Sequence, residues 1–165
     1  MSIKNILLVD DHAVVRTGLS VILHDYYQQI RIFEAANGDD ALTVLQQTKI
    51  DLLVLDLQIP NTDTIGLVEL ISIKYPTCYI LIFSMLPETI YARRILKAGA
   101  SGFLSKDSSF METKQAFDLA FANKKYISRI LTDILGNERA GKALSSPFDG
   151  LSHREFEIVS LLLAG

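Results

Sequence analysis

Short apolar runs alternate along the chain with amphipathic stretches of helical spacing. Runs such as LLVL and YILIF show no polar alternation, which is typical of β-strands buried on both faces. Strands that alternate with helices in this way indicate a parallel sheet covered on both sides. The pattern therefore predicts an α/β fold built on a five-stranded, doubly wound parallel sheet. The expected strands are Asn5–Val9, Ile30–Ala35, Leu52–Leu55, Tyr79–Phe83 and Gly102–Leu104.

The stretches between these strands carry the start and stop signals of helices. Gly99 stands where a helix should end, and Ser and Asp residues stand where the last of these helices should be capped. Apolar residues recur at helical spacing between these signals. The expected helices are Ala13–His24, Asp39–Gln47, Gly66–Lys74, Glu88–Ala98 and Ser108–Ala122.

Near Asn123 the alternation stops. Lys124–Leu135 has the pattern of a short helical connector, and Gly136–Gly150 is rich in the Gly, Ser, Ala and Pro of a linker. Ser152 and Glu155 then form a capping-box pattern, which predicts a further helix over Leu151–Gly165. Its expected apolar face consists of Phe156, Val159, Leu162 and Leu163. The predicted division is a first domain at 1–122, a connector and linker at 123–150 and the start of a helical domain at 151–165.

Composition narrows the class of protein. Of the 165 residues, 49% are hydrophobic and 21% charged, as in soluble globular domains. The apolar runs are strand-length and broken by Asp or Lys, which predicts no membrane span. The first strand follows no leader pattern. Cys78 has no disulfide partner, and we expect it to be a buried, inert thiol. The missing leader pattern and the missing disulfide both favour a cytoplasmic location. A net charge of −3 makes no general electrostatic case for nucleic-acid binding.

Polar residues follow four of the expected strands. Asp10 and Asp11 follow the first, Asp56 the third, Ser84 the fourth and Lys106 the fifth. They should converge, because the carboxyl ends of parallel strands meet at one edge of a sheet. Clustered carboxylates repel one another unless a hard cation such as Mg²⁺ neutralises them, and a lysine beside a metal suits phosphoryl chemistry. The sequence therefore predicts a Mg²⁺-dependent site that handles a phosphoryl group.

Together, VDD at 9–11, LDLQIP at 55–60, Ser84 and the SKD around Lys106 resemble the receiver domain of two-component response regulators, over about residues 3–122. The tail LSHREFEIVSLLLAG resembles the first helix of a LuxR-type helix-turn-helix, as in the NarL/FixJ-like group. This resemblance implies strand order 2-1-3-4-5 and a phosphoryl donor that is a sensor histidine kinase or phosphotransfer protein. It also implies a homodimer on phosphorylation, through helices one and five or through helix four, and DNA binding by a complete output domain.

The resemblance also implies roles for the site residues. Asp56 would be the phosphoacceptor, Asp11 a direct Mg²⁺ ligand and Asp10 a ligand through water. The backbone carbonyl of Gln58 would complete the Mg²⁺ ligands.

The remaining roles concern the phosphoryl group and the switch. Lys106 and Ser84 would meet phosphoryl oxygens, and Phe103 would be a switch aromatic that turns inward when Ser84 moves.

Two departures from the family pattern affect what we expect. The segment NTDTI, between Pro60 and Gly66, is about two residues longer than is usual before the third helix. This extra length affects the expected shape of the loop beside Asp56. The sequence also stops at Gly165, where a recognition helix should follow, so as written it should not place a helix in the major groove.

Simpler interpretations of single residues stay open. Asp10 or Asp11 could cap a helix from Ala13, and Phe103 could be a core residue that never moves. The three histidines show no ligand spacing, and His12 is expected to be an exposed residue at a helix start.

Three alternative functions are also open. An aspartate-nucleophile phosphatase usually needs a second aspartate two residues after the nucleophile, where this chain has Gln58. An interaction module that takes no phosphate and a flavin-binding domain are weaker alternatives. Nucleotide-cradle and serine-hydrolase motifs are missing from the sequence.

Overall fold

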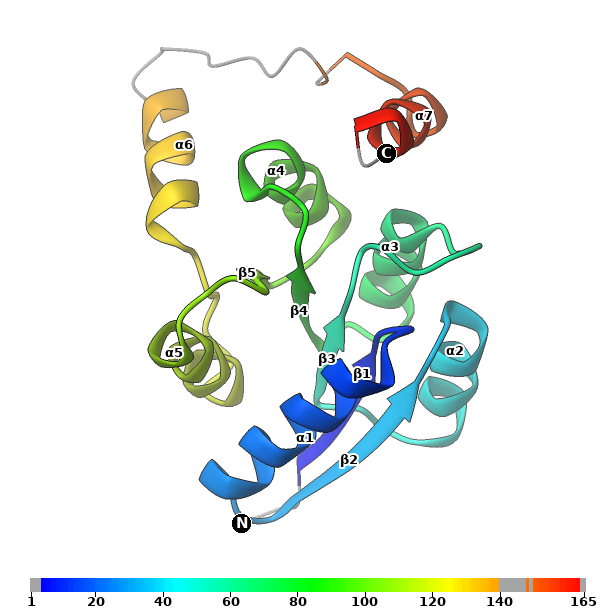
Figure 1. The fold of residues 1–165 in the computed structure, drawn as a ribbon, viewed down its shortest axis with the longest axis vertical. Coiled ribbons are helices and arrows are strands. Elements are labelled where there is room, and N and C mark those ends of the chain that lie inside the picture. The colour runs from blue at the N-terminus through cyan, green and yellow to red at the C-terminus, as the bar shows by residue number, and fades with distance from the viewer. Residues whose placement is uncertain (1–3, 140–147, 149, 164–165) are drawn as a thin grey trace.

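The computed structural model describes residues 4–139, 148 and 150–163. Five strands form one parallel sheet in the order β2-β1-β3-β4-β5 (Figure 1). The predicted fold class and strand order are confirmed, and each predicted strand lies within one residue of the observed bounds. The strands are β1 (Lys4–Val9), β2 (Ile30–Ala35), β3 (Leu52–Leu55), β4 (Tyr79–Ser84) and β5 (Gly102–Ser105).

Helices cover both faces of the sheet (Figure 1). Successive strand residues point to opposite faces, so Ile6 and Leu8 of β1 join one core while Leu7 and Val9 join the other. Burial on both faces explains why the strands are continuously apolar. One face packs against α1 (Ala13–Tyr26) and α5 (Phe110–Phe121), and the other against α2 (Gly38–Gln47), α3 (Thr64–Lys74) and α4 (Glu88–Ala98).

Local hydrogen bonds set the ends of these helices. Asp63 Oδ1 accepts from the Gly66 N–H at 3.0 Å, so α3 begins two residues before the predicted start. Ser109 and Glu112 form a capping box at the start of α5. Gly99 ends α4 as predicted, with a φ of 112° that a residue with a side chain rarely adopts.

Neither Asp10 nor Asp11 caps the first helix, the alternative role that the sequence leaves open for them. His12 occupies the N-cap position of α1, and its side chain makes no capping hydrogen bond. Asp10 instead accepts the His12 backbone N–H through Oδ1 at 2.8 Å, which turns this carboxylate toward the start of the helix without capping it.

The connector helix begins later than Lys124. Tyr126 forms an isolated bridge with Gly102, and its N–H donates to the Tyr79 hydroxyl at 3.0 Å, which excludes it from a helix. Ser128 Oγ then accepts from the Leu131 N–H at 3.1 Å and starts α6 (Arg129–Arg139). Because tertiary contacts hold Tyr126, helical spacing alone misplaced this boundary.

The same helix also ends later than predicted. It continues past Gly136 to Arg139, so the expected linker at Gly136–Gly150 is helical in its first four residues. Most of the rest of that linker, residues 140–147 and 149, lies outside the described residues. Leu131 is fully buried in the core on the α2–α4 face, which explains why α6 forms beside α4.

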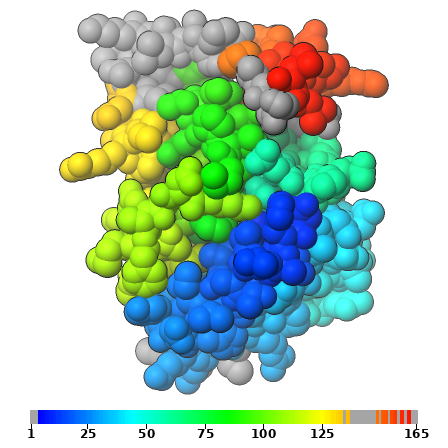
Figure 2. Space-filling view, viewed as in Figure 1, coloured from blue at the N-terminus to red at the C-terminus, as the bar shows by residue number. Residues whose placement is uncertain are grey.

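The last helix is α7 (His153–Leu163), and it lies beside α4 and α3 (Figures 1 and 2). The predicted capping box is present, since the Ser152 N–H donates to Glu155 Oε2 at 2.8 Å. Phe156 is 3% exposed, but Leu162, predicted on the same apolar face, is 76% exposed. The face is therefore only partly buried. Within the described ranges, no helix has the length and apolar character to cross a membrane.

Candidate functional site

The site forms where the strand order of the sheet reverses. β2 and β3 lie on opposite sides of β1, and the crevice at such a switch point is the usual ligand site of this architecture. Asp10 and Asp11 follow β1, and Asp56 follows β3. The Asp56 N–H donates to the Val9 carbonyl at 2.9 Å, so the two strand ends are tied directly beside each other.

Lys106 joins two of these carboxylates. Its Nζ lies 2.6 Å from Asp10 Oδ2 and 2.9 Å from Asp56 Oδ2. The group is secluded: the exposed side-chain fractions are 12% for Lys106, 5% for Asp10 and 2% for Asp56. Charge-assisted hydrogen bonds of this kind are strong because little water competes for them.

Two pKa shifts reflect this environment. Burial acts to lower the pKa of Lys106, but its hydrogen bonds to Asp10 and Asp56 outweigh burial and raise it. Burial acts to raise the pKa of Asp10, yet Lys106 and the His12 backbone N–H hold it below its usual value. The ammonium of Lys106 therefore links the carboxylates of Asp10 and Asp56.

His12 belongs to this cluster. Its Nδ1 lies 3.0 Å from Asp10 Oδ1 and 2.8 Å from Asp11 Oδ1. One ligand atom each from Asp10, Asp11, His12 and Asp56 fall within 4.8 Å of one another. His12 is exposed at the start of α1, as predicted, but sequence analysis did not place it with the acidic residues. Chain spacing did not reveal that the turn into α1 folds the imidazole back over both carboxylates.

The donor set fits a hard divalent cation. Three carboxylates supply oxygen atoms, the ligands that Mg²⁺ prefers. Gln58 adjoins them, because its N–H donates to Asp56 Oδ1 at 3.2 Å. Its side chain is exposed. The structure thus brings together four of the predicted site residues, Asp10, Asp11, Asp56 and Lys106. The Gln58 backbone lies beside them.

Ser84 and Phe103 lie deeper in the sheet. Ser84 is fully buried, its Oγ accepts from the Leu86 N–H at 3.2 Å, and its carbonyl accepts from the Lys106 N–H at 3.0 Å. Ser84 is thereby next to the Lys106 backbone. Phe103 is fully buried in the core on the α2–α4 face. It is therefore already inward in this structure, and its movement stays a prediction.

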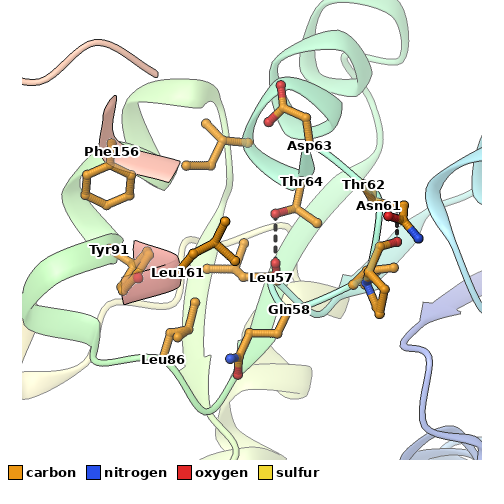
Figure 3. A pocket seen from close by; sticks show the side chains of 13 residues that line it. Leu57, Gln58, Asn61, Thr62, Asp63, Thr64, Leu86, Tyr91, Phe156 and Leu161 are labelled. Carbon is orange, nitrogen blue, oxygen red and sulfur yellow. Dashed lines mark hydrogen bonds between the residues drawn. The ribbon is translucent and has the colours of Figure 1, made fainter. Parts of the chain in front are cut away.

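A cavity of about 580 Å³ lies beside the site (Figure 3). It is lined by residues 57–65, which form the β3–α3 loop and the start of α3, by Leu86 and Tyr91, and by Phe156 and Leu161 of α7. The loop is held by Thr64, whose Oγ1 donates to the Leu57 carbonyl at 2.9 Å. The NTDTI segment therefore forms one wall of a cavity that α7 borders on the other side.

α7 contacts α4 through specific side chains. The Phe156 and Tyr91 rings meet edge to face with centroids 5.2 Å apart. Arg94 lies over the Phe156 ring, 4.1 Å from guanidinium carbon to centroid, and its Nη2 donates to the Leu151 carbonyl at 2.7 Å. Sequence analysis did not identify Tyr91 or Arg94. The available signal was that they lie three residues apart on α4, on one helical face.

Arg16 is a further residue that sequence analysis missed. Its Nη1 donates to the Asp10 carbonyl at 2.6 Å and its Nε to Glu34 Oε2 at 2.8 Å. Arg16 therefore fixes the backbone that carries the acidic pair.

Cys78 is a buried, inert thiol, as predicted. It is buried, and burial together with the nearby Asp51 charge raises its pKa to about 12, which makes it a poor nucleophile.

Comparison with known proteins gives consistent results. Residues 6–118 match the family described as the response regulator receiver domain. The chain is 34% identical over 169 residues to the oxygen regulatory protein NreC of Staphylococcus epidermidis, covering 97% of this chain and 77% of that protein. It is 29% identical over 158 residues to the response regulator GacA of Pseudomonas protegens, covering 96% and 74%.

Solved structures show the same fold. A LuxR-family two-component response regulator from Aurantimonas sp. aligns with a TM-score of 0.74 and 31% identity, over 84% of this chain and 99% of that one. RcsB from Salmonella enterica serovar Typhimurium, bound to promoter rprA in the presence of phosphomimetic BeF3-, aligns with a TM-score of 0.77 and 20% identity, over 99% and 79%. At 20% identity, the similarity to RcsB shows only that the two proteins share a fold.

Proposed function

This chain belongs to the response regulator receiver domain family, and we propose that it is a phosphorylation-controlled switch in which Asp56 accepts the phosphoryl group. The observation that carries the proposal is the position of Asp56, secluded at the end of β3 between an acidic pair and an ammonium. The donor would be a sensor histidine kinase or a phosphotransfer protein.

Transfer to Asp56 is a nucleophilic displacement. A carboxylate oxygen forms a bond to phosphorus, while the phosphorus–nitrogen bond of a phosphohistidine breaks and its electron pair stays on the imidazole. The Gln58 N–H and Lys106 Nζ each hold one oxygen of Asp56, at 3.2 and 2.9 Å, and this support of the carboxylate is consistent with the proposed attack. The product is an aspartyl phosphate at the sheet edge.

Asp10, Asp11 and Asp56 would hold Mg²⁺, together with the Gln58 backbone carbonyl. Bound there, Mg²⁺ supplies positive charge that offsets the three carboxylates and the phosphoryl oxygens. Asp10 has the further task of holding Lys106 in position before the phosphoryl group arrives.

Lys106 and Ser84 would receive the phosphoryl oxygens. Lys106 already bridges Asp10 and Asp56, so a short movement of its ammonium reaches a group carried by Asp56. Phosphorylation adds about two negative charges, which such donors then stabilise. Ser84 lies at the end of β4, directly before the loop that leads to α4, so its movement would pass to α4.

Helix α4 would transmit the conformational change from the site to the C-terminal segment. This helix holds α7 through Tyr91 and Arg94, and it packs against α6 through the buried Leu131. Repacking of α4 would therefore alter the docking of the C-terminal segment, and would favour a homodimer. Transcriptional control would follow through a complete LuxR-type DNA-binding domain. RcsB, which shares the fold, is described as bound to promoter DNA.

Labelling by a small acyl phosphate tests the proposal. The wild-type protein should take up one phosphoryl group in the presence of Mg²⁺ and none after chelation. Asp56→Asn should abolish the label, whereas Asp39→Asn, an exposed aspartate on α2, should keep it. Failure of the wild type to take label, together with no response to BeF3-, would exclude the switch and leave a phosphate-independent interaction module. Steady release of phosphate from a phosphomonoester would instead support a phosphatase.

A further inference from the structure

The two oxygens of the Asp10 carboxylate have different partners. Oδ2 accepts from Lys106 at 2.6 Å, whereas Oδ1 faces the His12 imidazole at 3.0 Å. The His12 backbone N–H also donates to Oδ1 at 2.8 Å, which fixes that oxygen relative to the ring. His12 Nδ1 is therefore aimed at the carboxylates, although 66% of the side chain is exposed.

The spacing of these atoms matches a set of metal ligands. Neighbouring ligands around an octahedral ion with bonds of about 2.1 Å lie about 3.0 Å apart. Nδ1 lies 3.0 Å from Asp10 Oδ1 and 2.8 Å from Asp11 Oδ1. A neutral imidazole can present one ring nitrogen to a metal while the other nitrogen carries the proton.

We propose that His12 Nδ1 is a ligand of the cation held by Asp10, Asp11 and Asp56, and that it shifts the preference of this site from Mg²⁺ toward divalent transition-metal ions. Mg²⁺ prefers oxygen ligands, whereas imidazole nitrogen binds Mn²⁺, Co²⁺ and Ni²⁺ in increasing order. The inference rests on the proposed function only in that it concerns the same metal site. Its consequence is a regulator whose phosphorylation responds to which divalent ion is present.

Metal binding measured without any phosphoryl donor tests this inference. Isothermal titration calorimetry would compare Ni²⁺ and Mg²⁺ affinities in the wild type and in His12→Gln. Loss of the imidazole should lower Ni²⁺ affinity at least about tenfold and change Mg²⁺ affinity by less than about twofold. His24→Gln is the matched control, because His24 lies on α1, the helix that follows His12, and its Nδ1 contacts the Ser20 carbonyl.

Pulsed electron paramagnetic resonance of the Mn²⁺-loaded protein gives a second readout. The wild type and His24→Gln should show the nitrogen modulation of a bound imidazole, and His12→Gln should lack it. An unchanged ratio of Ni²⁺ to Mg²⁺ affinity in His12→Gln, or wild-type Mn²⁺ spectra without nitrogen modulation, would overturn the inference. Failure of the proposed function is separate: the wild type would then take no phosphoryl label, whatever its metal preference.

Discussion

Lys106 and Asp56 form an ion pair, with Nζ 2.9 Å from Oδ2, although the strands that precede them are not neighbours in the sheet. β5 and β3 are separated by β4, so the lysine side chain spans a whole strand to reach the carboxylate. Asp10 completes the arrangement at 2.6 Å from the same ammonium. Asp10 and Asp56 therefore share one ammonium between them.

Replacing this cation should destabilise the metal-free protein. In Lys106→Met, two secluded carboxylates lose their partner, so the free energy of unfolding in chelator should fall by about 3 kcal/mol. Saturating Mg²⁺ should restore part of the loss, because it binds the folded state. Urea denaturation with and without Mg²⁺ measures both effects. Lys114→Met is the control: its pair with Asp118 is exposed, and its removal should cost less than about 1 kcal/mol.

Truncating Phe156 should release α7 from the sheet domain. Phe156→Ala removes the ring that packs on Tyr91 and beneath Arg94. Amide hydrogen exchange in residues 153–163 should rise at least about tenfold, while exchange in β1 and β3 stays unchanged. Leu162→Ala, on the exposed side of α7, should change neither. Unaltered exchange in Phe156→Ala would show that α7 docking does not depend on this ring.

Glu88 should make the stability of the α4–α6 contact depend on pH. Burial raises the pKa of Glu88, the hydrogen bond from Ser128 partly lowers it, and the charge of Glu112 raises it again. A carboxyl whose pKa is higher in the folded protein stabilises the fold below its unfolded-state value. That contribution is lost as pH rises through the folded-state value.

Denaturation of the wild type and Glu88→Gln at several pH values between 4 and 8 tests this. The wild type should lose more stability than the variant as pH rises over this range, because the glutamine does not ionise. Ser128→Ala should strengthen the wild-type trend, since it removes the hydrogen bond that lowers the pKa of Glu88. Parallel pH profiles in the wild type and Glu88→Gln would contradict the assignment of this pH dependence to Glu88.

The exposed surface of α1 and α5 should carry dimerisation. Tyr26 and Phe110 are 51% and 43% exposed, and their ring centroids are 5.2 Å apart. α4, by contrast, packs against Leu131 of α6 and Phe156 of α7. In this conformation, the first of the two predicted dimer surfaces is therefore the accessible one.

Phe110→Ser should thus reduce the BeF3--dependent dimer several-fold. The matched control is Ile73→Ser on α3, which replaces an 80% exposed apolar residue on another face of the molecule. Analytical ultracentrifugation with and without BeF3- measures both. Equal dimer fractions in the two variants would assign the dimer to a different surface.

The sheet and the convergence of its polar residues could be predicted because both follow from local rules. Continuous apolar runs identify strands buried on both faces, and parallel strands bring Asp10, Asp56 and Lys106 to one edge whatever the loops do. The predicted helix ends differ from the structure by two residues at most over the first five helices, where caps such as Asp63 shift the boundary.

Contacts between distant segments could not be predicted in this way. Tyr126 leaves the expected connector helix because its N–H bonds to Tyr79, 47 residues earlier. His12 joins the carboxylates through a turn whose geometry its spacing in the sequence does not encode. The docking of Phe156 on α4 likewise depends on tertiary packing, for which the apolar face of α7 is only a partial signal.

Chemical localisation of the phosphoryl group tests the central claim most directly. Borohydride reduces an aspartyl phosphate to homoserine, so treatment after incubation with an acyl phosphate and Mg²⁺ would mark the modified residue for peptide mass spectrometry. We predict homoserine at position 56 in the wild type, none after chelation of Mg²⁺, and none at Asp10 or Asp11. Homoserine at either of those positions, or no homoserine in a protein that binds Mg²⁺, would contradict the assignment of Asp56 as the phosphoacceptor.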